Sequence, residues 1–207
     1  MAKESKTRAK IAVLVSGGGT NLQALIDAQA SEIITSGVLS LVVSNNPQAY
    51  AIDRAQNAGI ETKIINKAEL GAEAFETELI DVLEQHDIDL IILAGFMCIL
   101  SKRFCEKFAN RIINVHPSLI PSFCGEGFYG LHVHEAALSY GVKVTGATVH
   151  FVNEIPDGGA IIAQKAVEVL PDDTPDVLQK RVMEQAEWIL LPRAAEMVSA
   201  QLMKGAN

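Results

Sequence analysis

The chain has 207 residues, 49% of them hydrophobic, and a formal net charge of −8. It can bury a core in one large domain or two small ones, and an acidic chain without a basic stripe is poorly suited to nucleic acid. Three cysteines without a CxxC pair predict reduced thiols. The polar start lacks a secretory h-region, and no apolar run reaches the ~18 residues of a membrane span. We therefore expect a cytoplasmic protein that does not enter a membrane.

The N-terminal region predicts an anion-binding loop. Ile11–Val15 is a continuous apolar run, typical of a strand buried on both faces. It is followed by Ser16-Gly17-Gly18-Gly19-Thr20-Asn21 and then by a helical pattern. Glycines let the backbone approach an anion, and the first N–H groups of a helix point at it. The loop is neither GxGxxG nor a Walker loop, and the alternative is a tight turn with Thr20 or Asn21 as helix cap. We favour a phosphate or another anion.

The next stretch alternates strands and helices. We predict strands at Val38–Ser44, Thr62–Ile65 and Leu90–Ala94, and helices at Ala49–Ala58, Ala72–Gln85 and Ser101–Phe108. Apolar residues follow the strand that ends at Ala94, at the edge of an α/β sheet where ligands bind. They are Phe96, Met97, Ile99 and Leu100. They predict either plain core packing or a hydrophobic slot for a flat ligand.

The segment Arg111–Pro121 carries the polar residues of most interest. Its apolar strand pattern ends at two prolines, and Asn114 and His116 alternate along it, so their side chains point the same way. A second polar loop, Asn153-Glu154-Ile155-Pro156-Asp157-Gly158-Gly159, follows another strand pattern. We predict that Asn114, His116 and Asp157 meet in one site. The alternative for His116, which precedes a proline, is a structural residue that caps a turn.

The remaining pattern completes the fold prediction. We expect a loop over Pro117–Gly130, then a helix, two strands and a final helix. These last elements are Leu131–Tyr140, Val144–Val152, Ala160–Leu170, and a helix that starts at Thr174-Pro175-Asp176 and is kinked or divided by Pro192. The prediction is an α/β, Rossmann-like fold with a mostly parallel central sheet, helices on both faces and a late antiparallel hairpin. We read residues 1–207 as a single domain, with a phosphate-binding half at about 10–100 and a half that carries the chemistry at about 101–207.

An asparagine, a histidine and an aspartate without a nucleophilic Ser or Cys suit acyl transfer to an external nucleophile. Asn114 can donate to a developing oxyanion, and a protonated His116 can stabilise it and pass a proton to the leaving group. Asp157 is expected to raise the pKa of His116 and to relay protons through water. His86 and His150 are weaker candidates, since each stands alone. His132 and His134 are two apart on a predicted helix, which is unsuitable for a metal pair, so we predict no metal.

These motifs resemble the glycinamide ribonucleotide formyltransferases, which belong to the folate-dependent formyltransferase family of de novo purine synthesis. The resemblance runs from Lys10 to about Pro192. Its motifs are Val15-Ser16-Gly17-Gly18-Gly19-Thr20-Asn21, Leu93-Ala94-Gly95-Phe96-Met97, Asn114-Val115-His116-Pro117-Ser118-Leu119 and Asp157-Gly158-Gly159. Their joint order and spacing make the resemblance specific.

The resemblance implies a role for each motif. The glycine loop, with Gly19, Thr20 and Asn21, would hold the substrate phosphate, and Glu187 would contact the ribose. Asn114, His116 and Asp157 would be catalytic, with 10-formyltetrahydrofolate as formyl donor. Its pterin pocket would be lined by Asn114, by Met97, Cys98, Ile99 and Leu100, and by Asn153, Glu154, Ile155, Pro156 and Asp157. Cys98 and Ala72 stand where the family often has arginine.

The expected partners are small molecules, glycinamide ribonucleotide and a reduced folate, and a homodimer is left open. The rival functions are hydrolysis of 10-formyltetrahydrofolate and a non-catalytic nucleotide-binding module. Deformylases usually carry an N-terminal regulatory domain, and only about ten residues precede the first predicted strand. A methionyl-tRNA formyltransferase needs a C-terminal RNA-binding domain, for which this chain is too short and too acidic.

Overall fold

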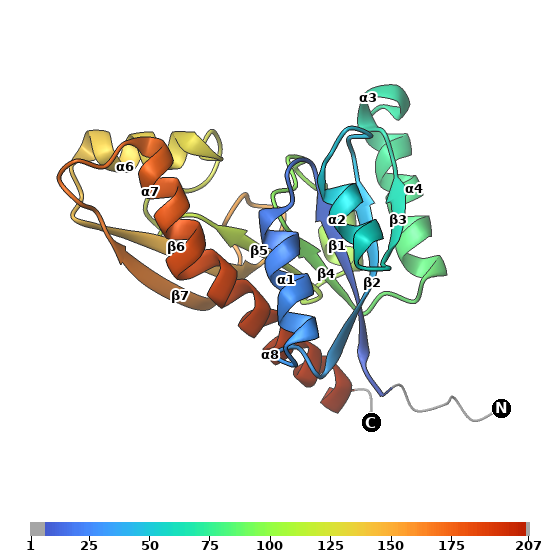
Figure 1. The fold of residues 1–207 in the computed structure, drawn as a ribbon. Coiled ribbons are helices and arrows are strands. Elements are labelled where there is room, and N and C mark those ends of the chain that lie inside the picture. The colour runs from blue at the N-terminus through green and yellow to red at the C-terminus, as the bar shows by residue number, and fades with distance from the viewer. Residues whose placement is uncertain (1–6, 206–207) are drawn as a thin grey trace. The chain divides into compact units, whose positions relative to one another are not determined.

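The computed structural model describes residues 7–205 and divides into two compact units (Figure 1). The first unit holds the chain up to Leu100 and again from Ala195, and the second holds Ser101–Ala194. The reading of the chain as a single domain with two halves stays a prediction. None of the helices within residues 7–205 combines the length and the apolar character that a membrane crossing requires.

The first unit is built on four parallel strands. They are β1 (Ala9–Val15), β2 (Gly37–Ser44), β3 (Glu61–Ile64) and β4 (Leu90–Leu93), and β1 pairs with both β2 and β4. The apolar run Ile11–Val15 has no exposed surface. Such burial on both faces explains why the run reads as continuously hydrophobic. All four strands predicted in this part of the chain are confirmed, with ends that differ by at most two residues.

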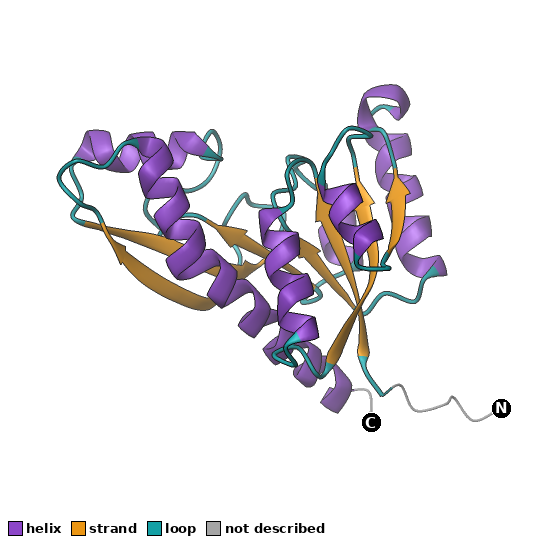
Figure 2. Cartoon of the chain, viewed as in Figure 1, coloured by secondary structure: helices purple, strands orange, loops and turns teal. Residues whose placement is uncertain are grey.

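Helices cover both faces of these strands. They are α1 (Thr20–Ala30), α2 (Ala51–Asn57), α3 (Lys67–Leu70) and α4 (Ala72–Gln85). Helices α1 and α2 lie on one face and α4 on the other (Figure 2), as right-handed crossovers in opposite directions from β1 require. The predicted helix Ala72–Gln85 is confirmed, and it buries Phe75, Leu79 and Leu83. The single turn of α3, capped by the Asn66 side chain, was not predicted.

The C-terminal helix α8 (Trp188–Gly205) closes the first unit with its last turns. The carboxylate of Glu196 accepts hydrogen bonds from the backbone N–H and the hydroxyl of both Thr35 and Ser36, at 2.7–3.1 Å. Next to them, a Cβ on Gly37 would lie 2.7 Å from the Ser199 hydroxyl. The start of β2 is therefore held close against α8, and a larger residue at Gly37 would have to displace the Ser199 hydroxyl or the Ile11 side chain.

The second unit is built on antiparallel strands. They are β5 (Ile112–His116), β6 (Val144–Phe151) and β7 (Ile161–Glu168), and β6 pairs with both neighbours. The helices are α5 (Lys102–Lys107), α6 (Leu131–Tyr140) and α7 (Pro175–Val182). Over the whole chain the strand order is β3-β2-β1-β4-β5-β6-β7. The predicted α/β fold, mostly parallel with a late antiparallel hairpin, is confirmed.

The predicted division of the last helix at Pro192 is wrong, and the kink that was its alternative stays a prediction. A π-helical segment, η1 (Met183–Glu187), separates α7 from α8, and α8 then runs through Pro192 without interruption. Proline lacks a backbone N–H, so it removes one helical hydrogen bond, and the wider π turn stands directly before that point in the chain. Segments of this kind are short insertions into α-helices and occur frequently at functional sites.

Candidate functional site

The carboxyl end of β5 places two polar side chains next to β6. Asn114 lies opposite His150 in the antiparallel register, and His116 lies opposite Thr148. The Asn114 Nδ2 atom is 3.3 Å from His150 Nε2. Strand pairing therefore brings an amide and two imidazoles to the same end of the sheet. His116 is 4% exposed and His150 is 2% exposed.

Asp157, on the loop between β6 and β7, completes this cluster. Its backbone is left-handed, with a φ of 55°, a conformation that aspartate tolerates better than most residues. One carboxylate oxygen lies 3.4 Å from His116 Nδ1 and the other lies 3.5 Å from His150 Nε2. The Gly125 N–H donates to the same carboxylate at 2.9 Å. The three residues predicted to meet are therefore brought together within the second unit.

The hydrogen bonds define where the proton of a neutral His116 resides. Its Nε2 lies 2.8 Å from the Phe123 carbonyl oxygen, which can only accept, so Nε2 carries the hydrogen. Phe123 itself is left-handed, with a φ of 49°. In the neutral ring Nδ1 is then a lone pair that faces the Asp157 carboxylate. That contact becomes favourable only when a proton lies between the two atoms.

Burial and charge act on His116 in opposite directions. Burial lowers the pKa of His116, the Asp157 carboxylate and the Phe123 carbonyl raise it, and the net pKa is lowered. The predicted contribution of Asp157, which raises the pKa of His116, is confirmed, but desolvation outweighs it. Burial also raises the pKa of Asp157, yet the neighbouring His150 side chain and the hydrogen bond from the Gly125 N–H outweigh it, and the net pKa is lowered. At neutral pH the cluster therefore holds a carboxylate and a neutral His116.

His150 belongs to this cluster although the sequence pattern ranked it as a weaker candidate. Its Nδ1 lies 2.8 Å from the Phe151 carbonyl, so that Nδ1 donates and Nε2 is free to accept from Asn114. The signal that could have found it is the register of β5 on β6, because a histidine opposite Asn114 must share its end of the sheet.

The other histidines lie outside the cluster of Asn114, His116, His150 and Asp157. His132 and His134 face different ways on α6, as predicted. His132 is exposed and contacts Glu135 at 3.2 Å. His134 is fully buried, and neither ring nitrogen has a hydrogen-bond partner in the described part of the chain. Within residues 7–205 no group of three or more His, Cys, Asp or Glu side chains could hold a metal ion.

The residues expected to face the pterin lie on two segments. After β4, Met97 and Ile99 are 57% and 74% exposed, whereas Leu100 is buried and belongs to the core. Cys98 is half-buried, and its sulfur accepts from Asn45 Nδ2 at 3.0 Å. In the second unit, the loop before Asp157 is held by Asn153, whose side chain bonds the Ile155 N–H and the Gly158 carbonyl. The residues Glu154, Ile155 and Pro156 of this loop are exposed.

The glycine loop opens α1 as predicted. Gly17 and Gly18 are exposed, and Gly19 is the N-cap in the left-handed region, with a φ of 71°. Helix α1 begins at Thr20 without a side-chain cap, so the alternative of a turn capped by Thr20 or Asn21 is wrong. Glu187, the residue expected to contact the ribose, lies in η1 of the second unit and is 6% exposed.

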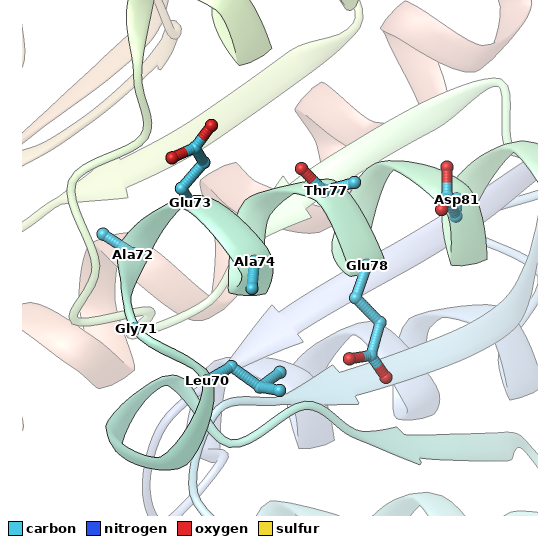
Figure 3. Close-up of a pocket in the computed structure, with 8 residues that line it drawn as sticks. All are labelled: Leu70, Gly71, Ala72, Glu73, Ala74, Thr77, Glu78 and Asp81. Atoms are coloured by element: carbon cyan, nitrogen blue, oxygen red, sulfur yellow. The ribbon is translucent and has the colours of Figure 1, made fainter.

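A surface hollow of about 640 Å³ lies on α3 and α4, where Glu73 and Glu78 project from successive turns (Figure 3). It is lined by Leu70, Gly71, Ala72, Glu73, Ala74, Thr77, Glu78 and Asp81. None of the predicted site residues is among them. Its three carboxylates would repel a phosphate or the carboxylates of a folate tail, so the hollow does not suit either substrate.

Comparison with known proteins identifies the family of the chain. The formyl transferase family matches residues 9–194. Phosphoribosylglycinamide formyltransferase of Escherichia coli (strain K12) is 42% identical over 86% of this chain and 82% of its own length. The trifunctional purine biosynthetic protein adenosine-3 of Homo sapiens is 44% identical over 94% of this chain, which spans only 19% of that protein. Glycinamide ribonucleotide transformylase 1 from Symbiobacterium toebii superimposes with a TM-score of 0.86 at 38% identity, over 96% of this chain and 89% of that one.

The family match covers both units, from the first strand to the C-terminal helix, and so includes the glycine loop and the cluster at the end of β5. The resemblance found in the sequence is thereby confirmed. The chain belongs to the formyl transferase family.

Proposed function

We propose that this chain transfers the formyl group of 10-formyltetrahydrofolate to the amine of glycinamide ribonucleotide, a step of de novo purine biosynthesis. The observation that carries the proposal is the meeting of Asn114, His116 and Asp157 at one end of β5. Relatives that the chain matches over most of their length, such as the Escherichia coli protein, are named phosphoribosylglycinamide formyltransferase. We further propose a cytoplasmic location, and a homodimer stays an open prediction.

The described residues fit a reduced folate. The exposed Met97 and Ile99 offer apolar surface directly after a parallel strand, and exposed apolar residues at that edge are typical of a ligand-covered face. The Met97 N–H is tied to the Ser16 hydroxyl at 2.8 Å, which fixes this segment. When bound, 10-formyltetrahydrofolate supplies the formyl carbon. The side chains of the cluster supply polarisation and proton handling.

Asn114 and His116 act on the oxygen of the reacting carbonyl. The Asn114 amide is held by His150, so its orientation is fixed before substrate arrives, and preorganised donors of this kind lower the barrier most effectively. The Nε2–H of His116 is occupied by Phe123 in the resting cluster. For His116 to donate to the oxyanion, its hydrogen bond to the Phe123 carbonyl must be replaced by one to the substrate oxygen. Phe123 lies on the Pro117–Gly130 loop, whose tip Glu126–Gly127 is exposed.

His116 and Asp157 handle one proton. Acylation of an amine releases one proton, and expulsion of the donor nitrogen consumes one. The position between His116 Nδ1 and the Asp157 carboxylate can hold the proton in the interval, because both atoms are acceptors in the resting cluster. With that proton in place His116 is an imidazolium, which stabilises the oxyanion, and Asp157 balances its charge.

Absorbance change on mixing the protein with 10-formyltetrahydrofolate, with and without glycinamide ribonucleotide, tests the proposal. Conversion that requires the amine supports a transferase, and equal conversion without it would make the chain a deformylase. The variant His116→Ala is expected to lose turnover almost completely while substrate binding, measured by calorimetry, changes little. Retained turnover in His116→Ala would refute the assigned roles.

A further inference from the structure

We infer that Arg54 supplies the positive charge of the anion site at the glycine loop, and that it binds the substrate phosphate directly. The inference rests on the proposed function, because it assigns one more residue to the site of glycinamide ribonucleotide. Arg54 lies on α2 and is half-exposed. Its Nε donates to the Gly18 carbonyl at 2.8 Å and its Nη1 to the Gln23 side chain at 3.0 Å.

The glycine loop lacks a charge that a phosphate requires. The segment Ser16–Asn21 contains no lysine or arginine. The N-terminus of α1 contributes the equivalent of roughly half a positive charge, whereas a phosphate monoester carries about −1.5 to −2 near neutral pH. In a chain of net charge −8, one cation beside the loop would offset most of that difference.

Arg54 is the cation that the fold brings to this loop. The Ala51 N–H donates to the Gly17 carbonyl at 3.1 Å, and a Cβ on Gly19 would lie 2.6 Å from the Ala51 Cβ. Helix α2 is thus packed directly against the loop, and Arg54, one turn beyond Ala51, extends over its edge. By contrast, Lys10 pairs with Asp87 and Lys63 pairs with Glu61.

The guanidinium group is held in place with donors to spare. Its carbon lies 4.9 Å from the centre of the Tyr50 ring, and its two hydrogen bonds fix the plane of the group. These bonds use two of the five N–H donors of an arginine. Within residues 7–205 Arg54 pairs with no carboxylate, and its Nη2 group has no hydrogen-bond partner. A fixed fork with unused donors beside a glycine loop suits a phosphate.

The test compares Arg54→Met and Arg54→Lys with wild type, using glycinamide ribonucleotide and its phosphate-free riboside. We expect Arg54→Met to raise KM for the ribonucleotide by about 10- to 100-fold, the effect of losing a charge-assisted hydrogen bond. KM for the riboside and for the folate should change less than about threefold, and kcat should be retained. Arg54→Lys should recover part of the loss. The matched control is Arg8→Met, which removes an exposed charge from the same unit.

An equal rise of KM for the ribonucleotide and the riboside would overturn the inference, since Arg54 would then only support the Gly18 carbonyl. An unchanged KM for both would also overturn it. A second measurement does not depend on turnover: inorganic phosphate should raise the Tm of wild type and of Arg8→Met, but not that of Arg54→Met. If wild type fails to transfer the formyl group yet shows this phosphate effect, the proposed function fails and the assignment of Arg54 to an anion site stands.

Discussion

Replacing Asp157 by asparagine tests the cluster most directly, because it removes one charge and keeps the shape of the side chain. The carboxylate oxygens lie 3.4 Å from His116 Nδ1 and 3.5 Å from His150 Nε2. Only 12% of this side chain is exposed. The amide oxygen of the Asp157→Asn variant could still accept from the Gly125 N–H, so the loop should keep its conformation.

The structure sets the size of the expected effect. At 3.4 Å, with an effective dielectric constant of about 20, a carboxylate and an imidazolium attract each other by about 5 kcal/mol. Each ~1.4 kcal/mol of lost transition-state stabilisation costs tenfold in rate, and positioned proton-transfer groups typically contribute about 10²–10⁴-fold. We therefore expect Asp157→Asn to lower kcat/KM by roughly 10²- to 10⁴-fold, mainly through kcat.

The assay is steady-state transfer of the formyl group to glycinamide ribonucleotide, with folding checked by thermal unfolding. Asp172→Asn is the matched control, since it removes an exposed carboxylate from the same unit and should leave kcat/KM unchanged. A folded Asp157→Asn variant whose kcat/KM stays within tenfold of wild type would refute the reasoning, because the carboxylate could not then stabilise a charged His116 in the transition state.

Three further predictions follow from the same contacts. Burial lowers the pKa of His134 to about 4 in the folded chain. As the pH falls below ~6.5, this histidine is therefore protonated in the unfolded chain before it is protonated in the folded one. His134 alone should lower the free energy of unfolding by about 2 kcal/mol between pH 7 and pH 5. In urea unfolding, His134→Gln should therefore lose less of its free energy of unfolding over this pH range than wild type. Glu187→Gln should raise KM for glycinamide ribonucleotide by about 10- to 100-fold with kcat retained, and an unchanged KM would exclude the ribose contact. The resemblance leads us to expect arginines where Cys98 and Ala72 stand, so a polyglutamate tail should add less than about fivefold to folate affinity. Ala72→Arg should increase that gain by about two- to fivefold, the value of an exposed ion pair. Folate titrations with one and five glutamates measure both effects.

The sequence patterns that predicted the fold correctly are local. A strand buried on both faces, such as Ile11–Val15, must be continuously apolar, and an amphipathic helix such as α4 must repeat its apolar residues at helical spacing. The elements that were missed lack such a signal. The four residues of α3 are too few for a period, and the π segment Met183–Glu187 differs from an α-helix only in its hydrogen-bond ladder.

The candidate site was predictable to the extent that it depends on one strand. Alternation along β5 placed Asn114 and His116 on one side, and the structure agrees. His150 was missed because its place depends on the register between β5 and β6. These strands are joined by a long connection, from Pro117 to Lys143, that consists of a loop and the helix α6. A pattern within either strand contains no information on that register.

The resting charge of His116 could not be read from residue identity alone. An aspartate beside a histidine suggests an imidazolium, but two backbone carbonyls change the assignment. Phe123 takes the Nε2–H of His116, and Phe151 takes the Nδ1–H of His150, so each ring turns a lone pair toward Asp157. Asn114 donates to one of these lone pairs, and the other faces the carboxylate unpaired. A cluster of acceptors in a buried place is ready to take up a proton. We therefore expect the imidazolium to form when the attacking amine releases its proton, at the stage when the negative charge on the carbonyl oxygen develops.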